Sequence, residues 1–199
     1  MESVVARRCM TFERIREVAS ELMCELGYRG MSMRALAAAV GVQAGSLYNF
    51  VESKQLLLFE LINQHEHDLL KVLRDRALGQ TDSAVQMHSL LWEKLAEYSA
   101  QGGRAARVAK AEIHHLDIEQ AEAIAEVRQL QRQELLRLIV KTAGDDIGLS
   151  PEGLENLCDE LHALLICHLN LEAEPHVDPT QVIRRQLRIL STRLLLNRD

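Results

Sequence analysis

The stretch MSMRALAAAVGVQAGSLYNFVESK, residues 31–54, constrains the fold of this 199-residue chain more than any other segment. Ser32 is a good N-cap for a short helix that residues 34–39 would fill. Gly41 follows, where a tight turn needs a residue that tolerates a positive φ angle. Residues 43–49 then form a second short helix. Two short helices joined by a glycine-containing turn predict a helix-turn-helix, whose second helix places side chains in the major groove of DNA.

The rest of the chain has apolar residues at helical spacing and no sustained strand alternation. Apolar residues make up 47% of the sequence, enough for a substantial core. We therefore predict an all-α fold, with a three-helix DNA-binding domain at residues 1–54 and a larger helical ligand-binding and dimerisation domain at residues 55–199. The helices are expected at 11–25, 32–49 (two helices), 53–78, 82–100, 104–115, 118–143, 151–173 and 179–197, with Gly102–Gly103 and Leu116–Asp117 among the connections.

The charge of the chain is unevenly distributed. Its formal net charge is −6, but residues 1–54 hold seven Lys and Arg against six Asp and Glu, so this segment carries +1 and the remainder −7. A nearly neutral DNA-binding domain contacts few phosphates, so we expect useful affinity to require two copies.

The last two expected helices are apolar over more than one face. The stripe of the first is Leu154, Leu157, Cys158, Leu161, Leu164, Leu165 and His168, which Ile166 and Leu169 widen, and the second carries Val182, Ile183, Leu187, Ile189, Leu190, Leu194 and Leu195. One face would pack on its own domain and the other on a second copy. This pattern predicts a homodimer through a four-helix bundle built from the last two helices. The alternative is a central core helix followed by a C-terminal strap.

No motif in the sequence points to catalysis, and we expect neither an enzyme nor a cofactor. There is no nucleophile motif or glycine-rich phosphate loop, and the four cysteines form no CxxC pair, so they read as reduced core residues. None of the eight histidines has a partner at i, i+4, so no metal site is predicted, although Glu112 and His115 could meet in three dimensions. Instead, one or two hydrogen-bonded histidines are expected in the core. No segment is long and apolar enough for a signal core or a membrane span, so we expect a cytoplasmic protein.

Residues 11–57 resemble the TetR (tetracycline-repressor-type) family of bacterial regulators. The matching positions are Thr11, Ile15, Ala19, Leu22, Gly27–Tyr28, Met31–Met33, Leu36–Ala37, Gly41–Val42, Gly45–Tyr48 and Ser53–Lys54. The resemblance implies a repressor that leaves its operator when a small molecule binds to the larger domain. Residues 112–116, followed by an arginine-rich helix, also resemble regulators of lipid or steroid breakdown. That second resemblance implies an acyl-CoA or fatty-acid-like effector.

Three positions depart from the pattern of the family. Phe50 and Val51 stand where the family commonly has a histidine, which often helps to hold a phosphate, and then a phenylalanine. That phosphate contact is therefore not expected in the same form, and Phe50 is expected to pack instead. Gln55 stands where the family has a glutamate.

The predicted DNA contacts divide into base readers and phosphate binders. Gln43 can pair with adenine and the methyl group of Ala44 can pack on thymine, while the resemblance implies that Arg34 also reaches a base. Ser32, Tyr48 and Lys54 are better placed for phosphate, with the ring of Tyr48 packed and its hydroxyl directed to DNA. The full predicted set is Ser32, Arg34, Gln43, Ala44, Ser46, Tyr48, Asn49 and Lys54.

The effector pocket is expected among the middle helices, where apolar walls with a few polar groups suit a small amphipathic molecule. The candidates are Met87, Leu91, Trp92, Leu95, Val108, Glu112, His115, Val127, Leu161 and Leu165. In the expected mechanism, the two recognition helices of a dimer lie about 34–36 Å apart on a palindromic operator. The effector favours a second state in which the 53–78 helix shifts and this spacing is lost. The alternative is an all-helical homodimeric interaction or ligand-binding module without specific DNA binding.

Overall fold

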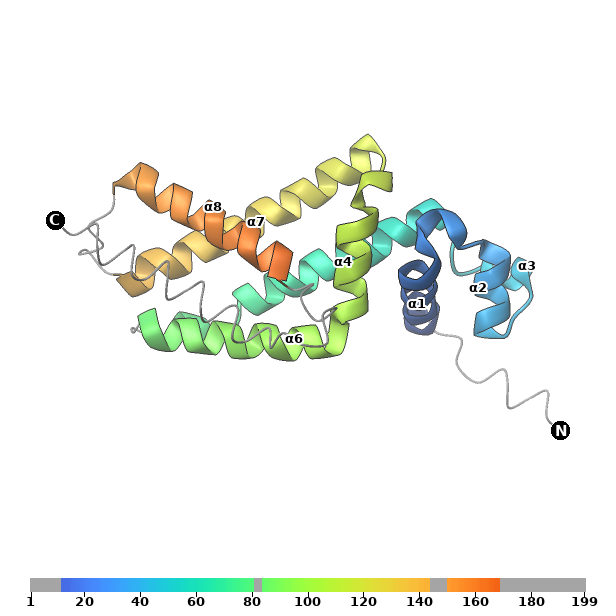
Figure 1. Cartoon of the computed structure of the whole chain (residues 1–199), viewed down its shortest axis with the longest axis horizontal. Helices are drawn as coiled ribbons and strands as arrows, with labels where there is room; N and C mark the ends of the chain where they lie inside the picture. Colours follow the sequence, from blue (N-terminus) through green and yellow to red (C-terminus); the bar gives the residue numbers. More distant parts are fainter. Residues whose placement is uncertain (1–11, 81–83, 144–149, 169–199) are drawn as a thin grey trace.

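The computed structural model describes residues 12–80, 84–143 and 150–168, and all regular elements in these ranges are helical. The prediction of an all-α fold is confirmed. The elements are α1 (Phe12–Gly30), α2 (Met33–Val40), α3 (Ala44–Leu47), α4 (Lys54–Leu73), α5 (Arg76–Gln80), α6 (Ala84–Glu112), the 3₁₀ helix η1 (Ile113–His115), α7 (Ile118–Ala143) and α8 (Pro151–His168). Figure 1 shows an elongated molecule with α1–α3 at one end and α6–α8 forming the other.

Several helix boundaries agree with the sequence signals that predicted them. The helix α7 spans Ile118–Ala143 as expected, and Asp117 caps it by accepting a 2.9 Å hydrogen bond from the backbone N–H of Gln120. The helix α8 begins at Pro151, and Ser150 caps it by accepting from the N–H of Gly153 at 3.1 Å. The predicted helix at 179–197, and the end of the one predicted to reach residue 173, lie outside the described residues.

Three boundaries differ from the prediction. The helix expected at 11–25 continues as α1 to Gly30, across a kink at Gly27 with φ 72° and ψ 164°. The other two helices end earlier than expected. The expected 53–78 helix ends at Leu73, because Asp75 accepts a hydrogen bond from the N–H of Ala77 and starts the separate short helix α5. The second helix of the 32–49 unit is shorter than expected: α3 covers only Ala44–Leu47, and the chain leaves it in a turn at residues 48–50. In both cases local hydrogen bonds end the helix before the apolar pattern does.

The prediction that Gly102–Gly103 separates two helices is wrong, since α6 runs continuously from Ala84 to Glu112. The ribbon of α6 bends partway along its length, so that its last part turns up beside the N-terminal helices (Figure 1). A glycine pair lowers helix propensity and is a common cause of such a bend. The later part of α6 packs on α1, and this packing keeps the chain helical across the pair.

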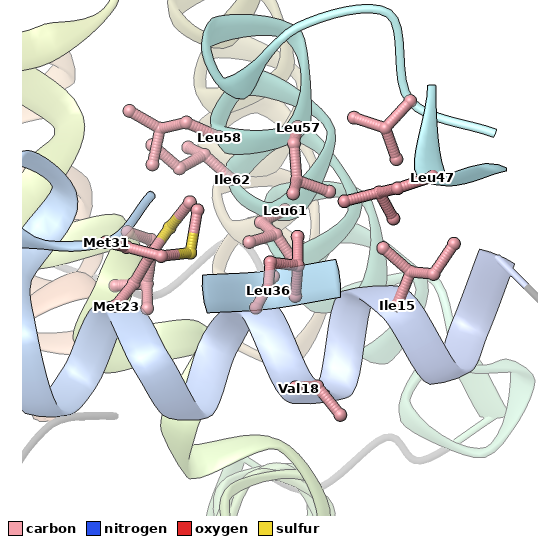
Figure 2. Close-up of a cluster of buried hydrophobic side chains, with 14 of the residues drawn as sticks. Ile15, Val18, Met23, Met31, Leu36, Leu47, Leu57, Leu58, Leu61 and Ile62 are labelled. Carbon is pink, nitrogen blue, oxygen red and sulfur yellow. The ribbon is translucent and has the colours of Figure 1, made fainter. Parts of the chain in front are cut away.

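A hydrophobic cluster, which we call the head cluster, joins α1–α3 to the first half of α4. Its fully buried members include Ile15, Met31, Leu36, Leu47, Leu57, Leu58 and Ile62. Figure 2 shows side chains from α4 meeting those of α1, α2 and α3 in this cluster. Val108, Ala109 and Ile124 from α6 and α7 belong to it as well. The predicted domain boundary after residue 54 stays a prediction, because the head cluster continues across that position.

A second cluster, the distal cluster, lies among α4–α8. It includes Leu69, Leu73, Leu78, Leu91, Leu135, Leu138, Cys158 and Leu165. The helix α8 packs on α7, and Arg132 reinforces the contact by pairing with Glu155 and Asp159. None of the helices that the structure describes is both long and apolar enough to cross a membrane.

Candidate nucleic-acid interface

The helix-turn-helix is built from α2, a glycine turn and α3. Ser32 caps α2 by accepting a 3.1 Å hydrogen bond from the N–H of Ala35. Gly41 ends α2 with φ 82° and ψ 32°, and the following N–H of Val42 donates to the carbonyl of Ala37 at 2.9 Å. No atom lies within 4 Å of a Cβ added to Gly41, so the left-handed backbone alone makes glycine the favoured residue there.

Six of the eight predicted DNA-contact residues are exposed at this end of the molecule. They are Ser32, Arg34, Gln43, Ser46, Tyr48 and Asn49. Ala44 is partly buried, and packs against the head cluster. These exposed side chains provide an arginine, two carboxamides and three hydroxyl groups, which are the donors and acceptors that contact bases and phosphates. Their contact with DNA stays a prediction.

Lys54 has a structural role that the sequence did not reveal. Its ammonium group donates to the carbonyl of Tyr28 at 2.8 Å and to that of Met31 at 2.9 Å, and lies 4.3 Å from the centre of the Tyr28 ring. A cation at the C-terminal end of a helix satisfies carbonyls that the helix leaves without partners. Lys54 thus ties the end of α1 to the start of α4, and only its remaining N–H is available for a phosphate.

Of the two departures next to α3, Phe50 is placed opposite to expectation. Phe50 was expected to pack, but its side chain is 44% exposed, whereas Val51 is buried in the head cluster. Tyr48 is 51% exposed, so its ring is not packed as predicted. The turn at residues 48–50 ends α3 and holds both aromatic side chains at the surface. An exposed aromatic pair therefore lies directly after the recognition helix.

Gln55 forms the polar junction between this end of the molecule and the larger helical part. Its side-chain oxygen accepts a 2.7 Å hydrogen bond from the hydroxyl of Tyr28. Its side-chain nitrogen donates at 2.8 Å both to the carbonyl of His115 and to the side-chain oxygen of Gln120. A carboxamide is required here, because one atom must accept while the other donates. The sequence showed only that a glutamine replaced a glutamate, since its partners lie 27 to 65 residues away.

A second polar group lies in the interior of the larger part. Glu66 is 1% exposed and accepts from Arg128 at 2.6 and 2.9 Å, while Gln131 donates to its carboxylate at 2.9 Å and to its carbonyl at 2.8 Å. His162 lies 3.0 Å from the side-chain oxygen of Gln131. The buried charge is therefore fully compensated, as a buried carboxylate requires.

Two histidines of this region confirm the expectation of hydrogen-bonded core histidines. Nδ1 of His65 lies 2.6 Å from the hydroxyl of Tyr98. Burial lowers the pKa of His65 and of His162 below the ordinary value, and burial raises the pKa of Tyr98. Both imidazoles are therefore neutral at pH 7 and the phenol stays protonated.

The predicted effector residues do not all meet at one place. Val108 belongs to the head cluster, whereas Leu91, Leu161 and Leu165 belong to the distal cluster, and Val127 is buried. The side chains of Met87, Trp92 and Leu95 lie outside those that the structure describes. The structure does contain an open hollow of about 280 Å³ between α4 and α6, and none of its lining residues was predicted. They are Lys71, Val72, Asp75, Lys94, Glu97 and Tyr98.

The two remaining predicted residues, Glu112 and His115, lie at the end of α6 beside the helix α1. Nε2 of His115 is 3.5 Å from Oε2 of Glu112, and its ring centre is 4.9 Å from that of Tyr28. A Cβ added to Gly27 would lie 3.5 Å from Oε1 of Glu112, and Gly27 itself has φ 72° within α1. Desolvation, followed by the nearby His114 and Arg29, lowers the pKa of His115. These residues therefore belong to the contact between the two parts of the molecule.

A helix-turn-helix attached to a larger helical domain is the architecture of a one-component DNA-binding regulator. Residues 15–61 match the family described as bacterial regulatory proteins of the tetR family. This match covers α2, α3 and parts of α1 and α4.

Several known proteins are similar to this chain. A stretch of 75 residues is 29% identical to the HTH-type transcriptional repressor KstR2 of Rhodococcus jostii, covering 38% of this chain and only 37% of the relative's length. A bacterial regulatory protein in the tetR family from Rhodococcus RHA1 has a similar fold (TM-score 0.75, 21% identity, 91% of this chain and 95% of that chain). So does AibR, solved with isovaleryl coenzyme A and operator DNA (TM-score 0.72, 18% identity, 89% and 96%).

Proposed function

We propose that this protein is a homodimeric transcriptional repressor that binds a palindromic operator and leaves it when an acyl-CoA or fatty-acid-like effector binds. One observation carries the proposal. The α2–α3 unit exposes polar side chains, and the part that contains it, α1–α3, which we call the head, is linked to the larger domain by hydrogen bonds of Gln55. The exposed groups supply the chemistry of DNA recognition. The hydrogen bonds of Gln55 supply a route by which a change in the larger domain reaches the head.

The assignment of base and phosphate contacts rests on exposure and chemistry. Gln43 is exposed at the N-cap of α3, where its carboxamide can pair with adenine, and the exposed guanidinium of Arg34 on α2 suits guanine. Ser32, Ser46, Tyr48 and Asn49 complete the exposed set and would fix the position of the head on phosphates. The single positive charge carried by residues 1–54 supports the expectation that two heads act together.

The proposed effector class rests on the similarity to AibR and on the aliphatic and polar side chains inside the larger domain. AibR, which shares the fold, was solved with an acyl-CoA, and KstR2 is named as a repressor. In this chain Leu91, Leu161 and Leu165 give the distal cluster aliphatic walls, and the buried group around Glu66 supplies polar atoms between α4, α7 and α8. Aliphatic walls with a few fixed polar groups suit an acyl chain that bears a polar end.

The repressor mechanism is a two-state equilibrium of the dimer. In the DNA-bound state, two α3 helices would lie about 34–36 Å apart and enter successive major grooves. An effector that binds better to the other state shifts α4 and spoils this spacing, by no more than its difference in affinity between the states. The predicted dimer contact is the pair of C-terminal helices, of which the described part is α8.

The experiment starts from an operator selected by the purified protein from a random duplex pool, and measures binding by fluorescence anisotropy. We expect an inverted-repeat consensus, bound by a dimer whose mass is confirmed by light scattering. Acyl-CoA thioesters from short branched to long chains are then compared with free fatty acids and with free CoA. The proposal is supported if one acyl series releases the operator and free CoA does not. Selection that yields no consensus would instead favour the interaction or ligand-binding module.

A further inference from the structure

The end of α6 gathers three side chains that are typical metal ligands. At Glu112 the chain passes from an α-helix into the 3₁₀ helix η1, and this change brings Glu112, His114 and His115 together. One ligand atom from each of the three residues lies within 4.8 Å of the others. The rings of His114 and His115 are in contact, with centroids 4.0 Å apart. The usual i, i+4 spacing of helical metal sites does not apply here, because these residues do not lie on one regular α-helix.

The carboxylate of Glu112 has unused bonding capacity in this position. Its side chain is only 12% exposed and that of His115 is 15% exposed, and the Nε2–Oε2 distance between them is 3.5 Å. Within the described part of the chain, no shorter polar contact to this carboxylate is present. A largely buried carboxylate is ordinarily satisfied by close hydrogen bonds, by a cation or by a metal ion. His114 is exposed, which leaves an open side to the cluster.

We propose that Glu112, His114 and His115 bind a divalent transition-metal ion, zinc in the first place, with water at the open side. Two imidazole nitrogens and one carboxylate oxygen are a ligand set that zinc uses in sites that keep an open position. Imidazole suits zinc and its first-row neighbours rather than magnesium or calcium. Zinc–ligand distances of about 2.0–2.2 Å require the three side chains to draw closer together on binding, and the ring of His114 lies at the exposed side of the cluster.

The position of this site gives the metal a structural effect. The carbonyl of His115 accepts from Gln55, the ring of His115 lies against Tyr28, and Glu112 lies against the backbone of Gly27. All three contacts join the head to the larger domain. An ion that fixes Glu112 to η1 therefore stiffens this junction, and raises the thermal stability of the chain by binding only to the folded state. This inference does not depend on DNA binding or on the effector.

The test uses the full chain without an affinity tag, stripped with a chelator and titrated with Co²⁺, which reports its coordination through visible absorption. We expect one equivalent of Co²⁺ per chain, displaced by Zn²⁺, and a zinc-dependent rise in Tm. The variants His114→Ala and Glu112→Gln should each weaken binding by about tenfold or more and abolish the rise in Tm. His67→Ala removes an exposed histidine of α4 outside the cluster and serves as the matched control.

The possible results of this titration distinguish a metal site at Glu112, His114 and His115 from binding elsewhere or from no binding. His114 is exposed, so its loss leaves the core intact, and circular dichroism of each variant checks the helical content. Absence of a Co²⁺ spectrum in the wild-type chain would overturn the proposal. So would equal Co²⁺ affinity in the wild-type chain and in His114→Ala, since the ion would then sit on other residues.

Discussion

The hydroxyl of Tyr28 donates a 2.7 Å hydrogen bond to the side-chain oxygen of Gln55, and so fixes which atom of this carboxamide faces α1 and which faces η1. The nitrogen is thereby directed to the carbonyl of His115 and to Gln120. Tyr28 in α1 and Gln55 at the start of α4 thus connect α1 to η1 and α7 through hydrogen bonds.

The first prediction concerns this carboxamide. Replacing Gln55 by glutamate keeps the size of the side chain, but sets a carboxylate oxygen against two acceptor oxygens. We expect Gln55→Glu to lower the free energy of unfolding by about 1–3 kcal/mol, measured by urea denaturation. Gln129→Glu, at an exposed position of α7, is the matched control and should change it little. Equal stability of the two variants would show that the junction does not depend on the amide nitrogen.

Lys54 should affect both stability and DNA affinity. In Lys54→Ala the carbonyls of Tyr28 and Met31 lose their donor, so we expect a loss of about 1–2 kcal/mol in the free energy of unfolding. If the remaining N–H also binds phosphate, operator and random duplex lose affinity alike, and the salt dependence of binding falls by about one ion. An unchanged salt dependence would assign Lys54 to the structure of the head alone.

Gln43 should behave differently because it is exposed and contributes only its backbone to the fold. We expect Gln43→Ala to leave the unfolding curve unchanged while it alters the preferred base at one position of each half-site, at a cost of about 1–3 kcal/mol for the original operator. Fluorescence anisotropy titrations measure the affinity of the variant for operators that are substituted at single positions. A uniform loss across all of these operators would contradict a base-reading role.

The buried carboxylate of Glu66 provides a prediction for the larger domain. In Glu66→Ala the guanidinium of Arg128, which is partly exposed, and the amide of Gln131 lose their acceptor. The expected cost is about 2–4 kcal/mol in the free energy of unfolding. Glu126→Ala, at an exposed position of α7, is the control and should cost little. The double variant Glu66→Ala, Arg128→Leu should recover part of the loss, because no unpaired charge remains.

The stability of the chain should fall as the pH is lowered below about 6.5. Burial lowers the pKa of His65 and of His162 in the folded state, so the unfolded chain binds protons there first. Stability is therefore complete above the unfolded pKa and declines below it, by up to about 1.4 kcal/mol per pH unit for each full proton. Urea denaturation at pH 7.5 and pH 5.5 measures the difference. His65→Gln should reduce it, whereas His67→Gln at the exposed position should not.

The sequence predicted those parts of the fold that short-range signals determine. Asp117 caps α7, Ser150 and Pro151 start α8, and Gly41 ends α2, and each of these positions carries its signal within three residues. The Gly102–Gly103 pair misled the prediction because packing on α1 outweighs a helix propensity that is lower by about 1 kcal/mol per glycine. The early end of α4 also depended on a single hydrogen bond, from Ala77 to Asp75.

The sites depend on contacts that a sequence pattern does not contain. Gln55 meets residues 60 and 65 positions away, and Glu66 meets Arg128 and Gln131 at similar separations. Glu112, His114 and His115 converge only because the chain changes to a 3₁₀ helix, and a search for helical spacing passes over them. The exposure of six of the eight predicted DNA-contact residues agrees with the motif, whereas the structural role of Lys54 required the end of α1 to be in place.

The shared core of the head and of α4 has a mechanical consequence. Leu57, Leu58 and Ile62 are buried in the head cluster, and Lys54 is bonded to the end of α1, so the head and the first turns of α4 form one rigid arm. The helix α4 has 20 residues, which makes it about 30 Å long at 1.5 Å per residue. The far end of α4, at Leu69 and Leu73, lies in the distal cluster. A rotation of α4 at that end would therefore move the head and α3 together with it. Any rotation of this arm about its far end would move α3 by a distance that grows with the length of α4.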